Sequence, residues 1–171
     1  MCLVTPAWAQ EESTPAPAGL GSVPVSIDIP RLGTHAEIVP LGLEDDGAMA
    51  APTDPDTVGW FEQGPGVGGQ GNLLLDGHVD WGGRLRVFGL LKTLQPGDTI
   101  QITDADGQTR SYAVVWTQLY QTDNAPLDEI FPTALDEQLT LITCGGAFDH
   151  AAHMYLSRWV VRAAPILVSA N

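Results

Sequence analysis

The chain is poor in basic residues, in cysteine and in long hydrophobic runs. Its 171 residues include 7 Lys and Arg against 21 Asp and Glu, a formal net charge of −14. Nucleic-acid binding needs clustered cations, so this balance excludes it, and it also disfavours electrostatic binding to an anionic membrane. The 2 Cys residues cannot build a disulfide framework or a four-thiolate zinc site. A membrane-spanning helix needs about 20 consecutive apolar residues, and the sequence contains no such run.

What is present fits one β-rich domain. Hydrophobic residues make up 44% of the chain and charged residues 16%, which is typical of a chain with a packed core. The 19 Gly and 13 Pro are spread along the sequence and indicate short elements joined by turns. Apolar runs and alternating patterns predict strands at 25–30, 36–43, 72–75, 99–103, 110–120, 138–144 and 155–161. We therefore predict an all-β, single-domain fold, a closed barrel of about eight strands.

Local signals also predict turns and short helical segments. Phe88, Leu91 and Leu94 recur every three residues, a spacing that suits a short helix or 3₁₀ segment. Residues 127–131, inside a Pro-containing connection, are expected to form one helical turn. The sequence Asp-Ala-Asp-Gly at 104–107 predicts a hairpin turn, because its Asp-Gly step supplies the positive-φ positions that such turns require.

The N-terminal segment has a different composition from the rest of the chain. Residues 1–9 are apolar and end in Ala7-Trp8-Ala9, a small-x-small pattern that predicts the end of a secretion signal with cleavage before Gln10. Residues 10–23 are rich in Pro, Ser, Thr, Ala and Glu and predict an extended linker. The folded domain is expected at 24–168. Such a tail predicts an extracytoplasmic protein, in the cell envelope or secreted, with membrane contact only through a possible N-terminal anchor.

Three residues with reactive or charged side chains lie at the edges of apolar strands: His78, Cys144 and Arg158. A Cys nucleophile reacts as its thiolate, and a nearby imidazolium stabilises that form. A fixed Arg can stabilise the negative charge of a tetrahedral intermediate. Taken singly, each residue fits an ordinary structural role, so the hypothesis rests on their combination.

That combination resembles the sortases, the cysteine transpeptidases of bacterial surfaces. The run Thr140-Leu-Ile-Thr-Cys144 matches the Thr-Leu-x-Thr-Cys hallmark, Gly77-His78 matches the histidine motif, and Arg158-Trp-Val-Val matches the Arg-x-x-Val context. The order His, Cys, Arg is also that of the family, and the match covers about residues 24–164. His-Val-Asp and Cys-Gly-Gly-x-Phe-Asp look most like the class E and F branches, whereas Arg-x-x-Val fits other branches better. Asp76 departs from the family, which has a small residue there.

The resemblance implies a sortase-like barrel and a cut-and-join reaction. Cys144 would attack a carbonyl in a Leu-Pro-x-Thr-Gly-like sorting signal of a substrate protein, forming a thioacyl-enzyme. His78 would act as general acid and then base, and Arg158 would donate to the substrate carbonyl or the oxyanion. An amine of peptidoglycan or of a pilin, or water, would resolve the acyl-enzyme. Residues 54–71 and 121–133 would form groove walls, and no cofactor or metal is implied.

Other interpretations of the same residues predict different chemistry. Cys144, Asp149, His150 and His153 lie within ten residues and could hold zinc, which would make the chain a zinc- or ligand-binding, non-catalytic β-domain of the cell envelope. Other cysteine peptidases and L,D-transpeptidases place their Cys in a different context or order.

Three further residues near these motifs leave alternatives open. Arg162 lies on the same face of its strand as Arg158, so pattern alone does not choose between them; position favours Arg158, and little change in activity is expected from Arg162→Ala. Asp80 is a candidate to orient His78 or an ordinary turn carboxylate. Trp81 is the tryptophan expected nearest to substrate.

Overall fold

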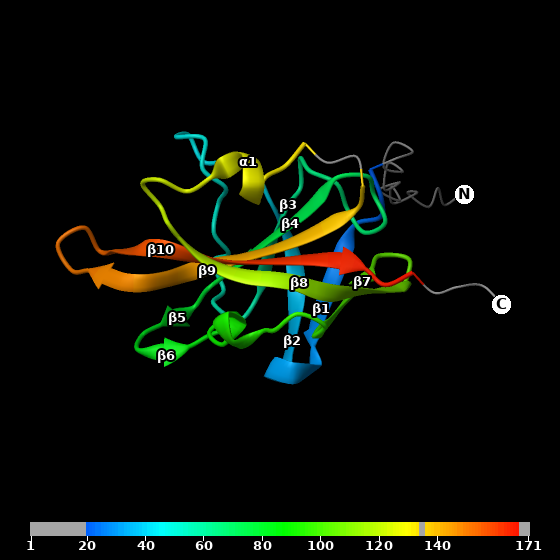
Figure 1. Ribbon diagram of the computed structural model, residues 1–171, viewed down its shortest axis with the longest axis horizontal. Helices are drawn as coiled ribbons and strands as arrows, with labels where there is room; N and C mark the ends of the chain where they lie inside the picture. Colours follow the sequence, from blue (N-terminus) through cyan, green and yellow to red (C-terminus); the bar gives the residue numbers. More distant parts are fainter. Residues whose placement is uncertain (1–19, 134–135, 168–171) are drawn as a thin grey trace, which may run out of the picture.

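The computed structural model describes residues 20–133 and 136–167 of the chain. Eight strands close into a barrel in the order β1-β2-β3-β4-β9-β10-β8-β7 (Figure 1). Their bounds are β1 (Pro24–Ile29), β2 (Thr34–Leu41), β3 (Val58–Phe61), β4 (Asn72–Gly77), β7 (Thr99–Asp104), β8 (Thr109–Gln121), β9 (Gln138–Asp149) and β10 (Met154–Pro165). The remaining elements are η1 (Pro30–Leu32), β5 (Asp80–Trp81), β6 (Arg84–Leu85), η2 (Leu91–Thr93) and α1 (Leu127–Ile130). The prediction of a closed, mostly β barrel is confirmed.

Side chains on one face of each strand point inward and fill the barrel interior. Ile27, Leu75, Ile102 and Leu141 come from four different strands, and each is fully buried in a single apolar cluster. Burying one such aliphatic side chain contributes about 1.5–3 kcal/mol. Because side chains alternate along a strand, the intervening residues lie on the outer face of the wall.

Two parallel pairings organise the barrel, while its other neighbours are antiparallel. β2 pairs with β3 in parallel, and β4 pairs with β9 in parallel with Leu75 opposite Leu141. Parallel neighbours need long crossover connections, and the chain makes one of them by passing through β7 and β8 before it returns to β9. The β4–β9 pairing therefore joins segments more than sixty residues apart, Asn72 facing Gln138.

Most of the predicted elements are present, and the differences are local. The short α1 falls inside the predicted helical turn, and η2 covers part of the segment from Phe88 to Leu94. Strand β3 was not predicted, because it has four residues with Gly59 inside it and depends on β2 and β4 for its hydrogen bonds. A Cβ at Gly59 would lie 2.2 Å from Cδ1 of Leu41, so a larger residue there would displace the Leu41 side chain.

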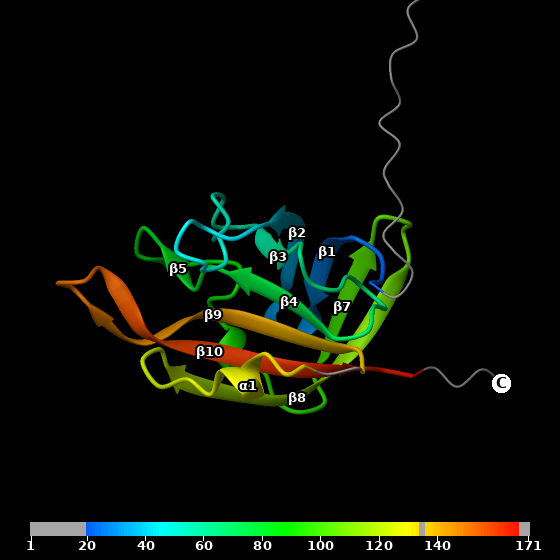
Figure 2. The same cartoon turned by 90° about the horizontal axis from the view of Figure 1, so that it is seen from above.

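The last two strands are longer than predicted. They extend past the barrel as a hairpin, at the left of Figure 1 and again of Figure 2. Strand β10 is paired on both sides along most of its length, with β9 and with β8. This three-stranded wall carries α1 on its outer side (Figure 2).

The start of the described chain is attached to the barrel. Ser22 forms a bridge with Val67, and the amide of Gly66 donates to the carbonyl of Leu20 at 2.6 Å. The segment predicted to be the end of a secretion signal, 1–9, and residues 10–19 of the predicted linker lie outside the described residues. Within the described residues, no helix has the length and apolar character needed to cross a membrane.

Candidate active site

The strand register brings the three predicted site residues to one place on the sheet. β4 and β9 are parallel with Asp76 opposite Ile142, so the residues two positions further along, His78 and Cys144, come next to each other. β9 and β10 are antiparallel, with Cys144 directly opposite Arg158. Neighbouring strands lie about 4.8 Å apart. His78, Cys144 and Arg158 therefore occupy adjacent positions across three neighbouring chain segments.

All three side chains belong to the outer face of the barrel wall. Leu75 on β4 and Leu141 on β9 are fully buried in the core. His78 and Cys144 each lie an odd number of positions from them and are only partly buried, as the alternation of side chains along a strand requires. The outer face is thus where a peptide could reach the thiol.

Cys144 lies within β9 and not at its end. The strand continues to Asp149, so the predicted end of the strand at residue 144 is wrong. The two glycines after Cys144 accompany a shift of register between β9 and β10. Gly146 has φ +75°, and a Cβ at Gly145 would lie 2.4 Å from Cδ1 of Trp159, so both positions favour glycine.

The surroundings of Cys144 disfavour its thiolate at rest. Burial raises the pKa of the thiol, Arg158 opposes that change, and the carboxylates of Asp76 and Asp80 add to it. The thiolate is the nucleophilic form of cysteine. A proton acceptor beside Cys144 is therefore needed to form it.

His78 is held by a backbone carbonyl. Its Nε2 lies 2.8 Å from the carbonyl oxygen of Pro52, and because a carbonyl only accepts, Nε2 carries the proton. The ring also meets Trp81 edge-on, with centroids 5.1 Å apart. Because the hydrogen bond to Pro52 occupies Nε2, Nδ1 is the ring nitrogen that remains to exchange a proton.

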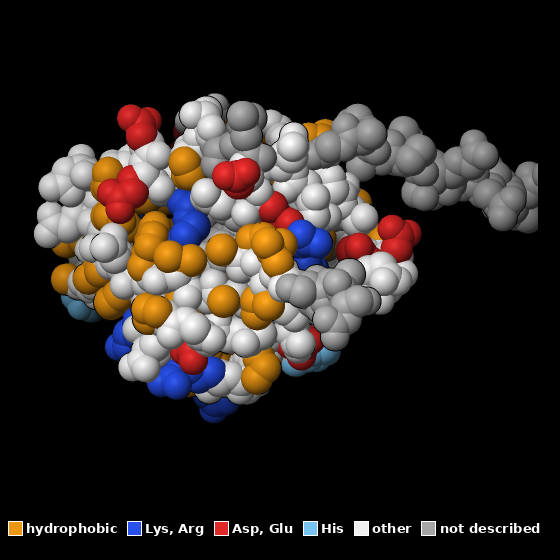
Figure 3. All heavy atoms as spheres, turned by 45° about the vertical axis from the view of Figure 1, so that its right-hand side comes forward, with side chains coloured by type: hydrophobic (Ala, Val, Ile, Leu, Met, Phe, Trp, Pro, Cys, Tyr) orange, Lys and Arg blue, Asp and Glu red, His pale blue; other side chains and the backbone are white. Residues whose placement is uncertain are grey.

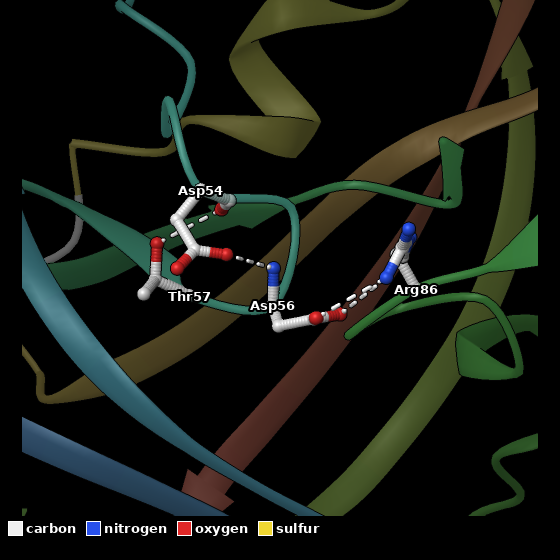
Figure 4. Close-up of polar contacts among 4 residues, drawn as sticks. All are labelled: Asp54, Asp56, Thr57 and Arg86. Carbon is white, nitrogen blue, oxygen red and sulfur yellow. Dashed lines mark hydrogen bonds and ion pairs between the residues drawn. The ribbon is translucent and has the colours of Figure 1, made fainter. Parts of the chain in front are cut away.

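The segment that carries Pro52 is itself braced (Figure 4). The Asp54 carboxylate accepts from the amide of Asp56 at 2.9 Å, and the hydroxyl of Thr57 donates to the Asp54 carbonyl at 3.0 Å. Arg86 pairs with the Asp56 carboxylate at 3.2 Å, and its own amide donates to the carbonyl of Val79. This network ties the segment before β3 to the loop that follows His78.

The hydrogen-bond partner of Asp80 is Tyr155, and not His78, the candidate partner from the sequence. Its carboxylate accepts a hydrogen bond of 2.7 Å from the hydroxyl of Tyr155, and that bond raises the pKa of Tyr155 to about 12. Asp80 thereby joins the loop after His78 to the β9–β10 hairpin. Its carboxylate acts on Cys144 through charge and not through a hydrogen bond to the thiol.

The two arginines of β10 occupy different environments. Arg158 faces Cys144, and its guanidinium donates to the carbonyls of Tyr155 and Ser157 at 3.0 and 2.9 Å. Arg162 faces Thr140 and is 6% exposed. Because the strand rises about 3.3 Å per residue, roughly 13 Å separates the two along β10. The register therefore places Arg158, the arginine that its position in the sequence favoured, opposite Cys144.

Asp76 is a largely buried carboxyl on β4 beside this cluster. Burial raises its pKa to about 6, although His78, Arg158 and the Gly77 amide all favour its ionised form. The folded protein therefore binds this proton more tightly than the unfolded chain does between about pH 4 and 6. Above that range, keeping Asp76 ionised lowers the free energy of unfolding by up to about 3 kcal/mol.

Asp76→Asn is accordingly expected to stabilise the protein at neutral pH. The gain in free energy of unfolding should approach about 3 kcal/mol at pH 7.5 and nearly vanish at pH 4, where the native carboxyl is already neutral. Urea titrations of both proteins at the two pH values measure this. An equal difference at both pH values would contradict the assignment.

The proposed zinc ligands do not come together. The described residues hold no group of three or more His, Cys, Asp or Glu side chains placed to bind a metal ion. His150 instead packs edge-on against Phe148, with centroids 5.1 Å apart. His153 has φ +53° in the hairpin turn. The zinc alternative therefore has no ligand set in the part of the chain that the structure describes.

Beside Cys144 the outer face is hollowed into a groove. A cavity of about 230 Å³ has Ile142, Arg158 and Val160 among its lining residues, and Leu127 and Ile130 of α1 line its other side. A larger cavity of about 550 Å³ lies towards the start of β4 and includes Leu74, Phe61 and Phe131. We define these two cavities together as the groove. Segments 61–65 and 122–132 contribute to its walls, within the two segments that the sequence predicted.

A family model described as the Sortase domain matches residues 27–166. The chain belongs to the sortase family. It is therefore a sortase, a cysteine transpeptidase, and the family resemblance predicted from the sequence is confirmed. Sortases are enzymes of the cell envelope that act on proteins carrying sorting signals.

Solved sortases share the fold of this chain. A lid mutant of sortase A from Corynebacterium diphtheriae is 25% identical and has a TM-score of 0.64, with 87% of this chain and 73% of that chain covered. Sortase C1 from Streptococcus agalactiae is 20% identical with a TM-score of 0.65, covering 85% and 68%. Sortase C-1 from Actinomyces oris is 22% identical with a TM-score of 0.64, covering 84% and 74%. A comparison with curated proteins finds no match.

Proposed function

We propose that this sortase cleaves a Leu-Pro-x-Thr-Gly-like sorting signal through a thioester on Cys144. The acyl group then passes to an amine of the cell envelope or of a pilin, or to water. The observation that carries the proposal is the register that aligns His78 with Cys144 and sets Arg158 opposite Cys144. It supports a nucleophile, a proton carrier and a cation within reach of one substrate carbonyl.

The first half of the reaction breaks the peptide bond after the Thr of the signal. Nδ1 of His78 takes the Cys144 proton, and the thiolate attacks the carbonyl carbon to form a tetrahedral intermediate. As the C–N bond breaks, the imidazolium returns that proton to the leaving amine. The products are a thioester on Cys144 and a free amino terminus on the released segment.

The second half consumes the thioester. An incoming amine loses a proton to His78 as its nitrogen attacks the thioester carbonyl, and the Cys144 sulfur leaves as thiolate, which is reprotonated from the imidazolium. The result is a new amide bond, or a carboxylate when water attacks. One of the similar solved structures is described as a pilus-related sortase C, which makes a pilin amine one acceptor to test.

The place of action proposed for this chain is outside the cytoplasm. The support is the apolar residues 1–9 followed by a Pro-rich stretch and the cell-envelope role of the family. Fractionation of cells expressing the full chain, with cleavage mapped at the amino terminus, tests whether Gln10 is the first residue of the exported form.

Arg158 is proposed to stabilise the oxyanion. Arg158→Ala should lower kcat/KM for a sorting peptide by about 100-fold or more, as for a lost oxyanion donor. Arg158→Lys should recover little of that loss, because an ammonium cannot reproduce the planar fork of a guanidinium. Peptide cleavage followed by fluorescence measures both. A rate for Arg158→Ala within a few-fold of wild type, with folding intact, would remove Arg158 from the mechanism.

A labelling experiment tests the proposed function as a whole. A sorting-signal peptide that ends in a vinyl sulfone should modify the protein at Cys144, and mass spectrometry of the digest locates the adduct. The modification should slow strongly in His78→Ala and should be unaffected by added Zn²⁺. Labelling at Cys2, or protection by the metal, would contradict it. Cleavage of a library of Thr-Gly and Thr-Ala pentapeptides then defines the preferred motif.

A further inference from the structure

Arg162 is a buried cation that the reaction above does not use. It is 6% exposed on the outer face of β10 and lies opposite Thr140 of β9 and Trp116 of β8. Its guanidinium lies over the Trp116 ring, 5.6 Å from the centroid. No carboxylate pairs with it among the described residues. A buried charge without a carboxylate needs hydrogen-bond partners instead. The partners of Arg162 identify the segments that it holds together.

Those partners are the last carbonyls of α1. One guanidinium nitrogen of Arg162 donates to the carbonyl oxygens of Glu129 and Ile130 at 3.0 and 2.8 Å. The other donates to the side-chain oxygens of Gln138 and Asn72. Carbonyls at the end of a helix have no partner within it. Arg162 therefore caps α1 and ties it to β9 and β4 at the same time.

Other side chains of the sheet support the same attachment. The amide group of Asn72 donates to the Ile130 carbonyl at 3.4 Å, and the Thr140 hydroxyl donates to Asn72 at 2.6 Å. The Tyr120 hydroxyl lies 2.9 Å from the carboxylate of Glu129. A helix of four residues has no stability of its own in water. The place of α1 is therefore set by these contacts, of which Arg162 supplies the most.

α1 in turn forms a wall of the groove. Leu127 and Ile130 line the cavity whose floor includes Ile142 and Arg158. Phe131, the next residue after α1, lines both this cavity and the larger one at Leu74. Hydrophobic side chains also gather on the face shown in Figure 3, with acidic and basic side chains around them. A small shift of α1 would change the width of the groove beside Cys144.

We propose that Arg162 is a positioning residue that fixes α1 over the sheet and thereby sets the affinity of this sortase for its sorting peptide. The inference rests on the proposed function, in which the peptide occupies this groove. It gives the two β10 arginines different roles, because Arg158 acts on the reacting carbonyl whereas Arg162 shapes the site that receives the rest of the peptide. It also replaces the expectation that Arg162→Ala leaves activity within a few-fold of wild type.

The kinetic test compares Arg162→Met with Arg162→Lys. Methionine keeps the apolar stem and removes every donor, so KM for a sorting peptide should rise about 10-fold while kcat stays within about 3-fold of wild type. Lysine should restore part of the affinity, because one ammonium reaches fewer of the four oxygens. The matched control is Arg110→Met, a half-exposed arginine that pairs with Glu137 away from α1; its KM should not change. An unchanged KM in a folded Arg162→Met protein overturns the proposal.

A second measurement does not depend on catalysis. Hydrogen exchange of peptides covering residues 122–133 should be at least about 10-fold faster in Arg162→Met, while strands β4 and β9 stay protected. If Arg162→Met does not fold, Asn72→Ala, which removes one bond to the same carbonyl, should show the same change at smaller size. Unchanged exchange in whichever variant folds overturns the proposal. The Cys144→Ala assay reports on the proposed function separately, because Cys144 does not contact α1 in this network.

Discussion

Cys144→Ala is expected to abolish both hydrolysis and transpeptidation of a sorting peptide. The loss in kcat should be about 10⁴-fold or more, the range seen when a covalent nucleophile is removed. Cys144 is the cysteine that the strand register sets opposite Arg158 and in line with His78. Cleavage of a fluorescent peptide, with and without an amine acceptor, measures both activities.

Two controls make this result specific to Cys144. Cys2→Ala, which changes the other cysteine, should leave both activities at the wild-type level. Cys144→Ala should retain the thermal midpoint of the wild type to within a few degrees, because the side chain is only partly buried. Activity that survives in a folded Cys144→Ala protein would remove the thioester from the mechanism.

His78→Ala is expected to lower kcat/KM by about 10²- to 10⁴-fold, the contribution of a general acid and base. The thiol of Cys144 has a raised pKa because it is buried, so without a neighbouring base little thiolate forms. The loss should therefore be largest near neutral pH and smaller at high pH, where hydroxide deprotonates the thiol directly. Rates of peptide cleavage between pH 6 and 10 measure the dependence.

The matched controls for His78 are His150→Ala and His153→Ala. Both residues lie in the turn of the β9–β10 hairpin, and each variant should cleave at close to the wild-type rate. A near wild-type rate for His78→Ala, together with a large loss in either control, would move the base to the hairpin. Reactivity of Cys144 towards iodoacetamide provides an independent measure, since it depends on thiolate and not on the peptide.

The support behind His78 explains why its position could not be predicted in full. The Gly77-His78 motif and the apolar run before it indicated a His at a strand end. The carbonyl of Pro52 that holds Nε2 comes from a segment 26 residues earlier in the chain. No pattern in the sequence marks that carbonyl, because every residue carries one. Its placement depends on the turn at Asp54 and on the Asp56–Arg86 pair (Figure 4).

The contacts of the charged residues near the site were likewise only partly predictable from the sequence. The sequence offered Asp80 as a candidate to orient His78, whereas its carboxylate binds the hydroxyl of Tyr155. It marked Asp76 as a departure from the family pattern, but not the burial that raises its pKa to about 6. Charge at a position is visible in a sequence. The dielectric surroundings that decide what the charge does are a property of packing.

The sequence by itself determined the class of fold and the family, and it singled out His78, Cys144 and Arg158 as candidate site residues. Alternating apolar residues on short segments define strands with one buried face, because that periodicity is local to each strand. The run from Thr140 to Cys144 and the order His78, Cys144, Arg158 are likewise readable along the chain. These are all properties of residues close together in sequence or of their order.

Position in the sequence favoured Arg158 over Arg162, but only the tertiary structure shows that Arg158 lies opposite Cys144 and which groups Arg162 contacts. Arg158 and Arg162 share one face of β10, and a register shift of β9 by four residues would exchange them. That register is set by the packing of Leu139 and Leu141 against the β4 residues Leu73 and Leu75 and by the core contacts of Val161. Such contacts join segments that are far apart in the chain, so the local pattern of residues within one strand does not predict them.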